Sequence, residues 1–491
     1  MKDKALLVKE LLAKITGYDL KDIKDESKID GDLGFDSLMI LDLQKSLQES
    51  FEDLDTQEIV RNLVTKDPSV SDLIHGLMGE VIPFGNLEIS DVTQFPEVSE
   101  FNEYLKNAAA HLTSIPYFRV NDGIATNYIT INGHPKINFS TYNYLGINGS
   151  KEINDEVKQV IDQYGTSVSG SRLLSGEIEI HQKLERKIAA FLGAEDALVQ
   201  VGGHSTNVNT IGNLVGLEDL ILHDALAHNS IVQGAILSHA KRKSFKHNDM
   251  KHLEHELKKL RHKFRRVLIV VEGVYSMDGD ICDLPTLIQL KEKYGAILMI
   301  DEAHSVGTIG KNGRGVTSYF EIEAGQVDIL MGTLSKALNS CGGYIAGKKA
   351  FINYLRYNSP GFIFSVGMTP PNAMAAYKSI QLCERSDELF VKLTHNSAYF
   401  LNRIKELGCD TSASQHTPII PLVVGDSSKT LKMSESLYQR GINVMPIVYP
   451  AVKENEARLR FFISASHTKE DIDFTIEQLG EVLAGEIQSN H

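Results

Sequence analysis

The sequence predicts an α/β protein with a mostly parallel sheet, preceded by a smaller all-helical module. Three apolar segments, at 267–271, 296–300 and 327–331, are typical of buried strands, and helical segments separate them. Apolar strands that alternate with helices favour a parallel sheet covered on both faces. The first 80 residues hold 10 Lys and Arg against 18 Asp and Glu, which is −8 of the chain's net charge of −14. A separate acidic unit therefore precedes the α/β part.

The N-terminal module, residues 1–80, is predicted to be a four-helix unit. A first amphipathic helix ends at Gly17, and a second begins at Ser37, after which apolar residues recur at helical spacing. Shorter helices are expected near 56–64 and 68–78.

The Asp36-Ser37-Leu38 triplet stands at the start of the second helix. Asp and Ser at this position usually cap free N–H groups. Here the triplet follows Leu33-Gly34 in an acidic helical unit, and the whole pattern resembles an acyl carrier protein. The resemblance implies that Ser37 carries 4′-phosphopantetheine, attached by a phosphopantetheinyl transferase and loaded by a separate acyl-loading enzyme. The acidic second helix would be recognised by basic patches on partner enzymes.

A linker is predicted over residues 81–114, with a helix from about residue 100 to 112. Turns are expected at Asn121-Asp122-Gly123 and at Asn132-Gly133, within a hairpin-like stretch. A large catalytic domain is expected over 115–375, and a small C-terminal α/β domain over 376–491.

Polar residues follow each predicted strand at its carboxyl end, where ligands of parallel sheets bind. These residues are Ser276, Asp301, His304, Thr333 and Lys336. A lysine amine can form a Schiff base with an aldehyde cofactor, and an aspartate can hold a pyridine nitrogen protonated. A turn rich in glycine and hydroxyl groups, at 202–207, could bind a phosphate through backbone N–H groups. The set predicts a site for pyridoxal phosphate (PLP).

Short motifs along the same region strengthen that prediction. They are Asn143-Tyr144-Leu145-Gly146, Gly170-Ser171-Arg172, His223-Asp224-Ala225-Leu226-Ala227-His228, Glu272-Gly273-Val274-Tyr275-Ser276-Met277, Asp301-Glu302-Ala303-His304-Ser305 and Gly332-Thr333-Leu334-Ser335-Lys336. With them, residues from roughly 115 to 485 resemble the α-oxoamine synthase family of fold-type I PLP enzymes. That family includes serine palmitoyltransferase, 8-amino-7-oxononanoate synthase, 5-aminolevulinate synthase and 2-amino-3-ketobutyrate CoA ligase.

The resemblance assigns roles around the cofactor ring. Lys336 would be the Schiff-base lysine, and Asp301 would bond the ring nitrogen. Ser276 and His304 would bond the ring oxygen. His228 would stack on the ring and contact the amino-acid carboxylate.

The cofactor phosphate is expected to lie against backbone N–H groups of Gly203 and His204. Thr333 and Ser335 would flank it. Ser365 matches a position that, in this family, reaches the phosphate of the other subunit. The resemblance therefore implies a homodimer with active sites at the interface.

Two further residues are expected to hold the amino-acid substrate. Asn143 would lie near the substrate carboxylate, and Arg460 would clamp it with a planar fork of donors. Arg458 is expected to be a surface neighbour of Arg460.

The reaction implied is a decarboxylative condensation of an amino acid with an acyl thioester, giving an α-amino ketone. Lys336 would remove the Cα proton. Because a tether raises effective concentration to roughly millimolar, we expect the acyl group to arrive on Ser37 rather than on free CoA. The stretch around Arg172 is expected to be too apolar for a short acidic acyl chain. Serine is the favoured amino acid, ahead of glycine, alanine and cysteate-like acids, and the product would be a lipid base or a secondary metabolite.

Three other functions are disfavoured. Asp301-Glu302-Ala303-His304 is also a helicase Walker B signature, but the G-x-x-x-x-G-K-[ST] phosphate loop is missing, and the acidic charge is unsuited to nucleic acid. A PLP aminotransferase or lyase would give the acyl carrier module no role in the reaction. A carrier scaffold with an inactive enzyme domain conflicts with the complete set of PLP-site residues.

The four cysteines show no C-x-x-C spacing, and no apolar run approaches transmembrane length. We therefore expect a cytoplasmic protein. No metal site is expected.

Overall fold

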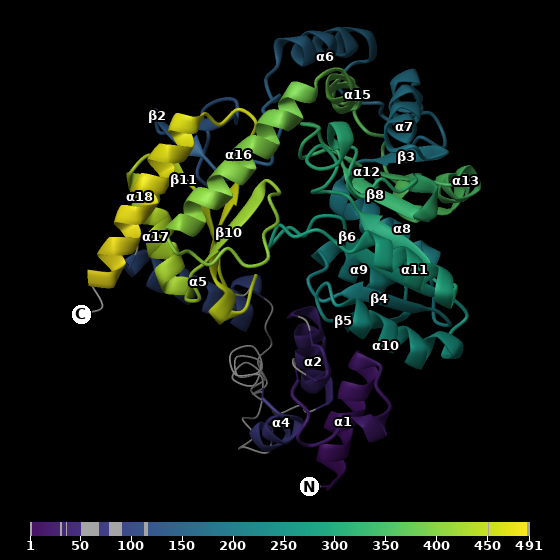
Figure 1. Ribbon diagram of the computed structural model, residues 1–491. Coiled ribbons are helices and arrows are strands. Elements are labelled where there is room, and N and C mark those ends of the chain that lie inside the picture. The colour runs from purple at the N-terminus through teal and green to yellow at the C-terminus, as the bar shows by residue number, and fades with distance from the viewer. Residues whose placement is uncertain are drawn as a thin grey trace. The chain divides into compact units, whose positions relative to one another are not determined.

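The computed structural model describes residues 2–29, 32–35, 37–50, 68–77, 91–111, 116–449 and 451–488. The chain forms two compact units: one holds residues 1–120, 423–459 and 478–491, and the other holds 121–422 and 460–477. Figure 1 shows the helices and strands of both. The domain boundaries at 80, 114 and 375 stay predictions.

The N-terminal module packs helices α1 (Lys2–Thr16), α2 (Ser37–Ser50) and α4 (Val70–Gly76), with a short 3₁₀ turn, η1 (Leu20–Asp22), between the first two. Gly17 has a positive φ of 81° and ends the first helix, as predicted. Apolar residues from all three helices share one core; these include Val8, Leu12, Leu43, Leu47 and Leu73. The predicted helices before Gly17, after Ser37 and near 68–78 are confirmed. The one expected near 56–64 lies outside the described residues.

A further 3₁₀ turn, η2 (Val92–Gln94), leads to helix α5 (Pro96–His111). The sequence predicts this helix from about residue 100, but it begins at Pro96. Proline is favoured in the first helical turn because its missing N–H is not needed there.

The large unit is built on a seven-stranded sheet with the order β3-β9-β8-β7-β6-β4-β5. Its strands are β3 (Asp196–Gln200), β4 (Leu220–Asp224), β5 (Lys241–Phe245), β6 (Val267–Glu272), β7 (Ile297–Asp301), β8 (Ile329–Thr333) and β9 (Gly343–Gly347). Only β9 runs antiparallel to its neighbours, and the other pairs are parallel. The three apolar segments are the adjacent strands β6, β7 and β8, so the predicted mostly parallel sheet is confirmed.

Both faces of the sheet are covered, as the continuous apolar strands require. Along β6, Val267, Ile269 and Val271 belong to one hydrophobic cluster. Leu268 and Val270, which point to the opposite face, belong to another. Helices lie against the sheet strands in Figure 1.

The helices that follow α5 are α6 (Lys151–Tyr164), α7 (Glu179–Leu192), α8 (Gly203–Leu214), α9 (Asn229–Leu237), α10 (Met250–Leu260), α11 (Leu284–Tyr294), α12 (Val316–Tyr319), α13 (Lys349–Asn358), α14 (Pro360–Ile363), α15 (Pro370–Arg385), α16 (Asp387–Glu406), α17 (Ser427–Gln439) and α18 (Lys469–Gln488). The remaining 3₁₀ turns are η3 (Arg261–Lys263), η4 (Lys311–Gly313), η5 (Ala324–Gln326) and η6 (Glu454–Glu456).

A hairpin of β1 (Tyr128–Ile131) and β2 (His134–Asn138) turns at Asn132-Gly133, where both residues have positive φ. This confirms the predicted Asn-Gly turn. At the other expected turn, Asn121 Nδ2 donates to Gly123 O at 2.7 Å, and Asp122 N donates to Thr130 O at 2.8 Å, so residues 121–123 lie along β1. The remaining strands are β10 (Ile419–Val423), β11 (Ile442–Asn443), β12 (Met445–Ile447) and β13 (Arg458–Phe462).

None of the helices in the described part of the chain has the length and apolar character that a membrane crossing needs.

Candidate active site

The carboxyl ends of three adjacent strands bring the predicted site residues to one edge of the sheet. Asp301 ends β7 and is paired in register with Glu272, the last residue of β6. Thr333 ends β8, and Lys336 follows three residues later. Because these strands are parallel neighbours, polar side chains that are far apart in sequence meet at that edge.

The Asp301 carboxylate is buried and held by two donors. Its Oδ2 accepts from Asn207 Nδ2 at 2.7 Å, and its Oδ1 accepts from Ala303 N at 2.9 Å. Asn207 lies on α8, and its Oδ1 is buried with no hydrogen-bond partner among the described residues. A carboxylate fixed in this way can hold a cationic ring N–H.

Lys336 is half-buried on the loop after β8. Burial lowers the pKa of the Lys336 amine to about 8, although the carboxylates of Asp301 and Glu272 act to raise it. The Lys336 Nζ also lies 5.5 Å from the centre of the Tyr142 ring. An amine with a pKa this low is partly neutral near physiological pH, so it can act as a nucleophile or a base.

His304 is buried beside Tyr144. Its Nδ1 shares a hydrogen bond of 2.8 Å with the Tyr144 hydroxyl. Burial, and then the positive charge of Lys336, hold the pKa of His304 well below its usual value, so the ring is neutral. Tyr144 lies in the Asn143-Tyr144-Leu145-Gly146 motif, but sequence reasoning assigned it no role.

His228 caps the N-terminus of α9. Its Nδ1 accepts from Ser230 N at 3.3 Å and lies 2.8 Å from Ser230 Oγ. Asn207 Nδ2 donates to the same hydroxyl oxygen at 2.9 Å, so the hydroxyl proton can go to His228 Nδ1. Loss of hydration lowers the pKa of His228, although Asp301 opposes the shift. A continuous set of hydrogen bonds therefore links His228 to Asp301.

An anion-binding arrangement lies at the start of α8. A Cβ added at Gly203 would lie 2.7 Å from Thr333 Oγ1, so only glycine allows the helix to come this close to the end of β8. Thr333 Oγ1 is 2.8 Å from Ser335 Oγ. Free N–H groups at a helix start and adjacent hydroxyls suit a phosphate. His204 is exposed, and its Nε2 lies 3.3 Å from Asn229 Oδ1.

Arg460, on β13, is positioned by the loop after β6. Its Nη1 donates to the Ser276 backbone oxygen at 2.9 Å, and its Cζ lies 4.7 Å from the centre of the Phe462 ring. Its Nε is buried with no hydrogen-bond partner among the described residues, which leaves a donor for an anionic ligand. Ser276 is half-buried, and its own N–H lies 3.4 Å from Glu272 Oε2.

The structure corrects two expectations about arginines. Arg458 is not a surface residue: it is buried, its Nε donates to Glu456 O at 2.8 Å, and its guanidinium pairs with the Glu456 carboxylate. The stretch around Arg172 is not apolar either, because the buried Arg172 pairs with Glu177 and Glu185. These charges line a cavity of about 370 Å³, so polarity there does not exclude an acidic acyl chain.

Two predicted residues have mainly local partners in this structure. The buried Asn143 donates to Ala125 O at 3.3 Å and accepts from Asn148 N at 3.3 Å. The Ser365 hydroxyl, after α14, donates to Gly361 O at 2.6 Å.

The donors and acceptors present fit PLP. Asp301 offers a fixed carboxylate for the ring nitrogen, and Lys336 offers a partly neutral amine. The start of α8, which Gly203 allows to lie against Thr333, offers donors for the phosphate. Together with the sheet topology, they define a fold-type I PLP-dependent transferase.

Comparison with known proteins narrows this class. The family "Aminotransferase class I and II" matches residues 134–479, and "Phosphopantetheine attachment site" matches residues 7–75. The chain is 40% identical to 8-amino-7-oxononanoate synthase of Fervidobacterium nodosum, over 72% of this chain and 90% of the relative. It is 37% identical to serine palmitoyltransferase of Bacteriovorax stolpii, over 74% and 86%.

Among solved structures, a serine palmitoyltransferase variant from S. paucimobilis with a bound PLP–myriocin aldimine superposes with a TM-score of 0.76 at 27% identity, covering 80% of this chain and 99% of that one. The chain belongs to the α-oxoamine synthase family of PLP-dependent acyltransferases, and it carries a phosphopantetheine-binding domain at its N-terminal end.

Proposed function

We propose that this enzyme condenses an amino acid, with serine favoured, with an acyl group carried as a thioester on its own phosphopantetheine-binding domain. The observation that carries the proposal is the presence of a carrier domain and an α-oxoamine synthase in one chain. The overall reaction converts an amino acid and an acyl–carrier thioester into an α-amino ketone, CO₂ and the free carrier thiol.

The phosphopantetheine is proposed to be attached at Ser37, the first residue of α2. Anionic groups are stabilised at helix N-termini, which suits a phosphodiester at this position. A phosphopantetheinyl transferase would modify Ser37, and a separate enzyme would load the acyl chain.

The residues of the catalytic unit have complementary tasks in this proposal. PLP, when bound, supplies an electron sink for negative charge at Cα. Asp301 holds the ring nitrogen, and Lys336 accepts the Cα proton at Nζ and later returns one. Arg460 binds the substrate carboxylate through the donors that the Ser276 oxygen leaves available. The neutral rings of His304 and His228 can donate hydrogen bonds without adding charge that would oppose the Lys336 proton.

Serine is favoured because two kinds of comparison include serine palmitoyltransferases. Other relatives are 8-amino-7-oxononanoate synthases, and the first test below therefore compares single amino acids.

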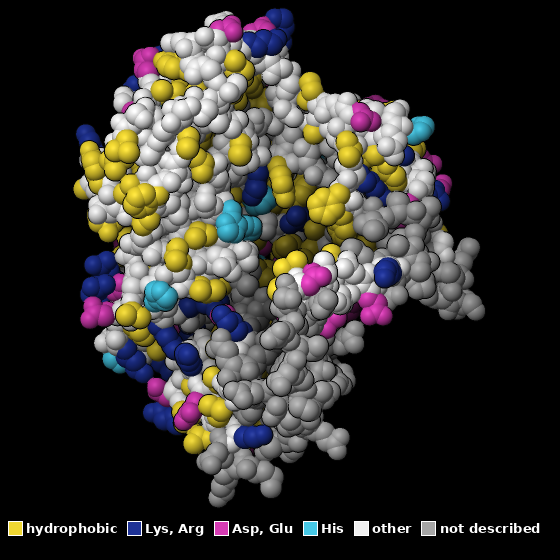
Figure 2. Space-filling view, turned by 180° about the vertical axis from the view of Figure 1, so that it is seen from behind, with side chains coloured by type: hydrophobic (Ala, Val, Ile, Leu, Met, Phe, Trp, Pro, Cys, Tyr) yellow, Lys and Arg dark blue, Asp and Glu magenta, His cyan; other side chains and the backbone are white. Residues whose placement is uncertain are grey.

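We further propose a homodimer that brings Ser365 to the phosphate in the partner's site. The region around Ser365 exposes several large apolar side chains: Leu174, Tyr357, Phe364 and Val366 are 84%, 66%, 87% and 52% exposed. Such a group of apolar residues is typical of an interaction surface. Figure 2 shows exposed apolar side chains over one face of the molecule. A cytoplasmic location agrees with the four free cysteines.

The first test is a spectral titration of the PLP-bound enzyme with single amino acids. A shift of the visible band for serine, and its loss in Lys336→Ala, would support the proposed substrate and lysine. If the visible band shifted only for another amino acid, that amino acid would replace serine as the proposed substrate.

The second test concerns the carrier. Phosphopantetheinylated enzyme is loaded with an acyl group, and CO₂ release and the α-amino ketone are measured for the wild type and Ser37→Ala. Loss of turnover only in Ser37→Ala is expected. Equal turnover of both proteins with acyl-CoA would contradict carrier delivery and leave the condensation itself intact.

A further inference from the structure

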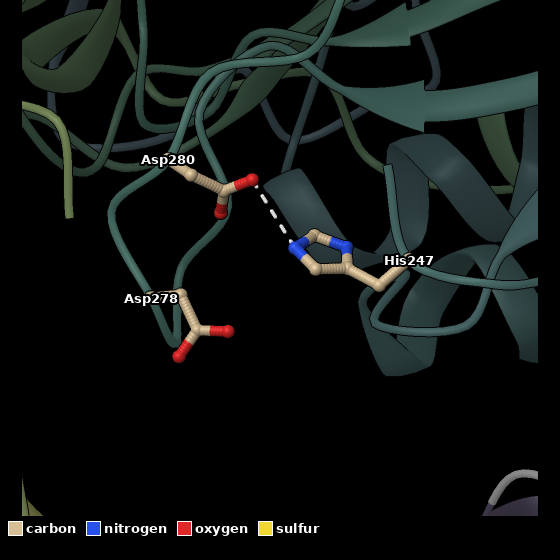
Figure 3. A group of neighbouring side chains, drawn as sticks. All are labelled: His247, Asp278 and Asp280. Atoms are coloured by element: carbon tan, nitrogen blue, oxygen red, sulfur yellow. Dashed lines mark ion pairs between the residues drawn. The ribbon is translucent and has the colours of Figure 1, made fainter. Parts of the chain in front are cut away.

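A second group of ionisable side chains lies beside the active site, outside the residues assigned above. His247 follows β5, and Asp278 and Asp280 lie on the loop after β6 (Figure 3). One ligand-type atom from each lies within 4.8 Å of the others, a spacing that a metal ion could bridge. The chemistry of the histidine decides what this group does.

Both ring nitrogens of His247 face carboxylates. Nδ1 lies 2.8 Å from Asp224 Oδ1, and Nε2 lies 3.1 Å from Asp280 Oδ2. Asp224 and Asp280 are fully buried, whereas the His247 side chain is 22% exposed. The two carboxylates raise the pKa of His247 to about 10, despite the opposing effect of burial. A ring whose Nδ1 hydrogen-bonds one buried carboxylate and whose Nε2 forms an ion pair with another is favoured as the imidazolium cation, which has no lone pair for a metal, so His247 itself serves as the cation between two buried anions.

Asp224, at one end of this bridge, shapes the loop that carries His228. Its Oδ1 also accepts from Leu226 N at 2.8 Å, and its Oδ2 accepts from Asn248 N at 2.8 Å. The Leu226 bond closes a tight turn two residues before His228. The direction in which the His228 ring enters the site therefore depends on where the Asp224 carboxylate is held.

Asp280, at the other end, closes the loop that carries Ser276. Its backbone oxygen accepts from Tyr275 N at 3.0 Å, and its carboxylate accepts from Asn248 Nδ2 at 3.0 Å. The Ser276 backbone oxygen within this loop accepts from Arg460. The Asp280 end of the bridge thus fixes the oxygen that orients the proposed carboxylate clamp.

We propose that His247 is a positioning residue for the amino-acid substrate, a protonated bridge between Asp224 and Asp280 that fixes His228 and Arg460 relative to each other. This inference rests on the proposed function, in which His228 and Arg460 contact the amino acid. His247 itself touches neither PLP nor substrate. Removing it lets the two loops move apart, because two buried carboxylates then face each other without a cation.

The test is the amino-acid dissociation constant, read from the visible band of PLP-bound enzyme. His247→Gln is expected to weaken amino-acid binding by about tenfold or more, the usual effect of losing a partner of buried charges. The affinity for PLP should fall less than the affinity for the amino acid, because His228 is only one of the residues proposed to hold PLP and Asp301 and Lys336 are unchanged. The affinity for the acyl donor should change by less than about threefold. Equal losses for all three ligands, or no loss of amino-acid binding, would overturn the proposal.

Arg265 offers a matched control. Its guanidinium pairs with the buried Asp219 carboxylate at 2.8 Å, but Asp219 precedes β4, at the end of that strand opposite Asp224. Arg265→Gln should leave amino-acid binding unchanged. An equal loss in both variants would show a general effect of removing the partner of a buried carboxylate and overturn the proposal.

Asp280→Asn is isosteric and provides a second route should His247→Gln fail to fold. It is expected to weaken amino-acid binding too. The double variant should bind the amino acid no more weakly than the single variant with the larger loss, because both substitutions remove the same bridge. Additive losses in the double variant would overturn the proposal.

A chelator tests whether the group binds a metal instead. If a chelator weakened amino-acid binding to the wild type, that result would identify a metal and overturn the proposal. If the visible band of the wild type responded to no amino acid, the proposed function would be wrong. Equal amino-acid affinities in the wild type and His247→Gln would instead overturn only the role of His247.

Discussion

Asn207 donates its side-chain amide to Asp301 Oδ2 across 2.7 Å. The same nitrogen donates to Ser230 Oγ, which in turn lies 2.8 Å from His228 Nδ1. One amide on α8 therefore orders both the carboxylate proposed to hold the ring nitrogen and the histidine proposed to stack on the ring. The arrangement keeps His228 neutral, in agreement with the lowered pKa that burial gives it.

Asn207→Ala should weaken PLP binding. The variant leaves Asp301 Oδ2 without its donor, and an unsatisfied buried acceptor costs about 1–3 kcal/mol, or roughly 5- to 150-fold in affinity. Titration of the cofactor-free protein with PLP measures the effect. Asn209→Ala is the control, because Asn209 lies on the same helix but donates to Gln200 at 3.0 Å. Similar affinities for the two variants would count against a role of Asn207 at the cofactor.

Gly203→Ala should selectively impair recognition of the cofactor phosphate. The new Cβ would lie 2.7 Å from Thr333 Oγ1 and 3.0 Å from its Cβ, so the start of α8 must move. We expect PLP affinity to fall about tenfold or more and the affinity for pyridoxal, which has no phosphate, to change little. Gly216→Ala, where a Cβ meets nothing closer than 4.0 Å, is the control. A parallel fall for PLP and pyridoxal would argue that the phosphate lies elsewhere.

The sequence predicts the frame of this site because the frame depends on local pattern. Three apolar strands, each followed by polar residues, suffice to place Ser276, Asp301 and Lys336 at one edge of a parallel sheet. The Asn132-Gly133 turn is equally local, since its two residues tolerate positive φ.

What the sequence does not predict depends on partners distant in the chain. Tyr144 meets His304 across 160 positions, and Asn207 meets Asp301 across 94. No spacing rule connects such pairs. Arg458 is misassigned because an arginine is normally exposed, whereas this one is buried and bonds to the Glu456 backbone oxygen and carboxylate.

The pH dependence of PLP binding should report the Lys336 amine. Only the neutral amine attacks an aldehyde, and desolvation lowers the Lys336 pKa to about 8. The association rate with cofactor-free protein should therefore rise about tenfold per pH unit below that value and level off above it. Arg460→Gln removes a positive charge that lowers this pKa, so its midpoint should move to higher pH. Stopped-flow absorbance measures both profiles. A midpoint near that of a free lysine would contradict the environment seen here.

Glu272→Gln should stabilise the protein in a pH-dependent way. Glu272 is buried, its Oε1 has no hydrogen-bond partner among the described residues, and burial followed by repulsion from Asp301 raises its pKa to about 8 from 4.5. The folded state therefore holds a proton that the unfolded state releases, so this group's contribution to stability falls as pH rises from 4.5 towards 8. Glu272→Gln removes that loss. The free energy of unfolding of the variant should therefore exceed that of the wild type by on the order of a few kcal/mol at about pH 8, and the difference should vanish near about pH 5.

The measurement is the Tm of PLP-saturated wild type and variant at both pH values. Glu302→Gln provides the contrast. Burial also raises the pKa of Glu302, to about 7, but the bonds that its carboxylate accepts from the Ser305 hydroxyl and from Val316 N oppose that shift. Glu302→Gln loses those charge-assisted bonds, so it should gain less stability at about pH 8 than Glu272→Gln. Parallel Tm curves for the wild type and Glu272→Gln would show that Glu272 titrates at an ordinary pKa in the folded protein.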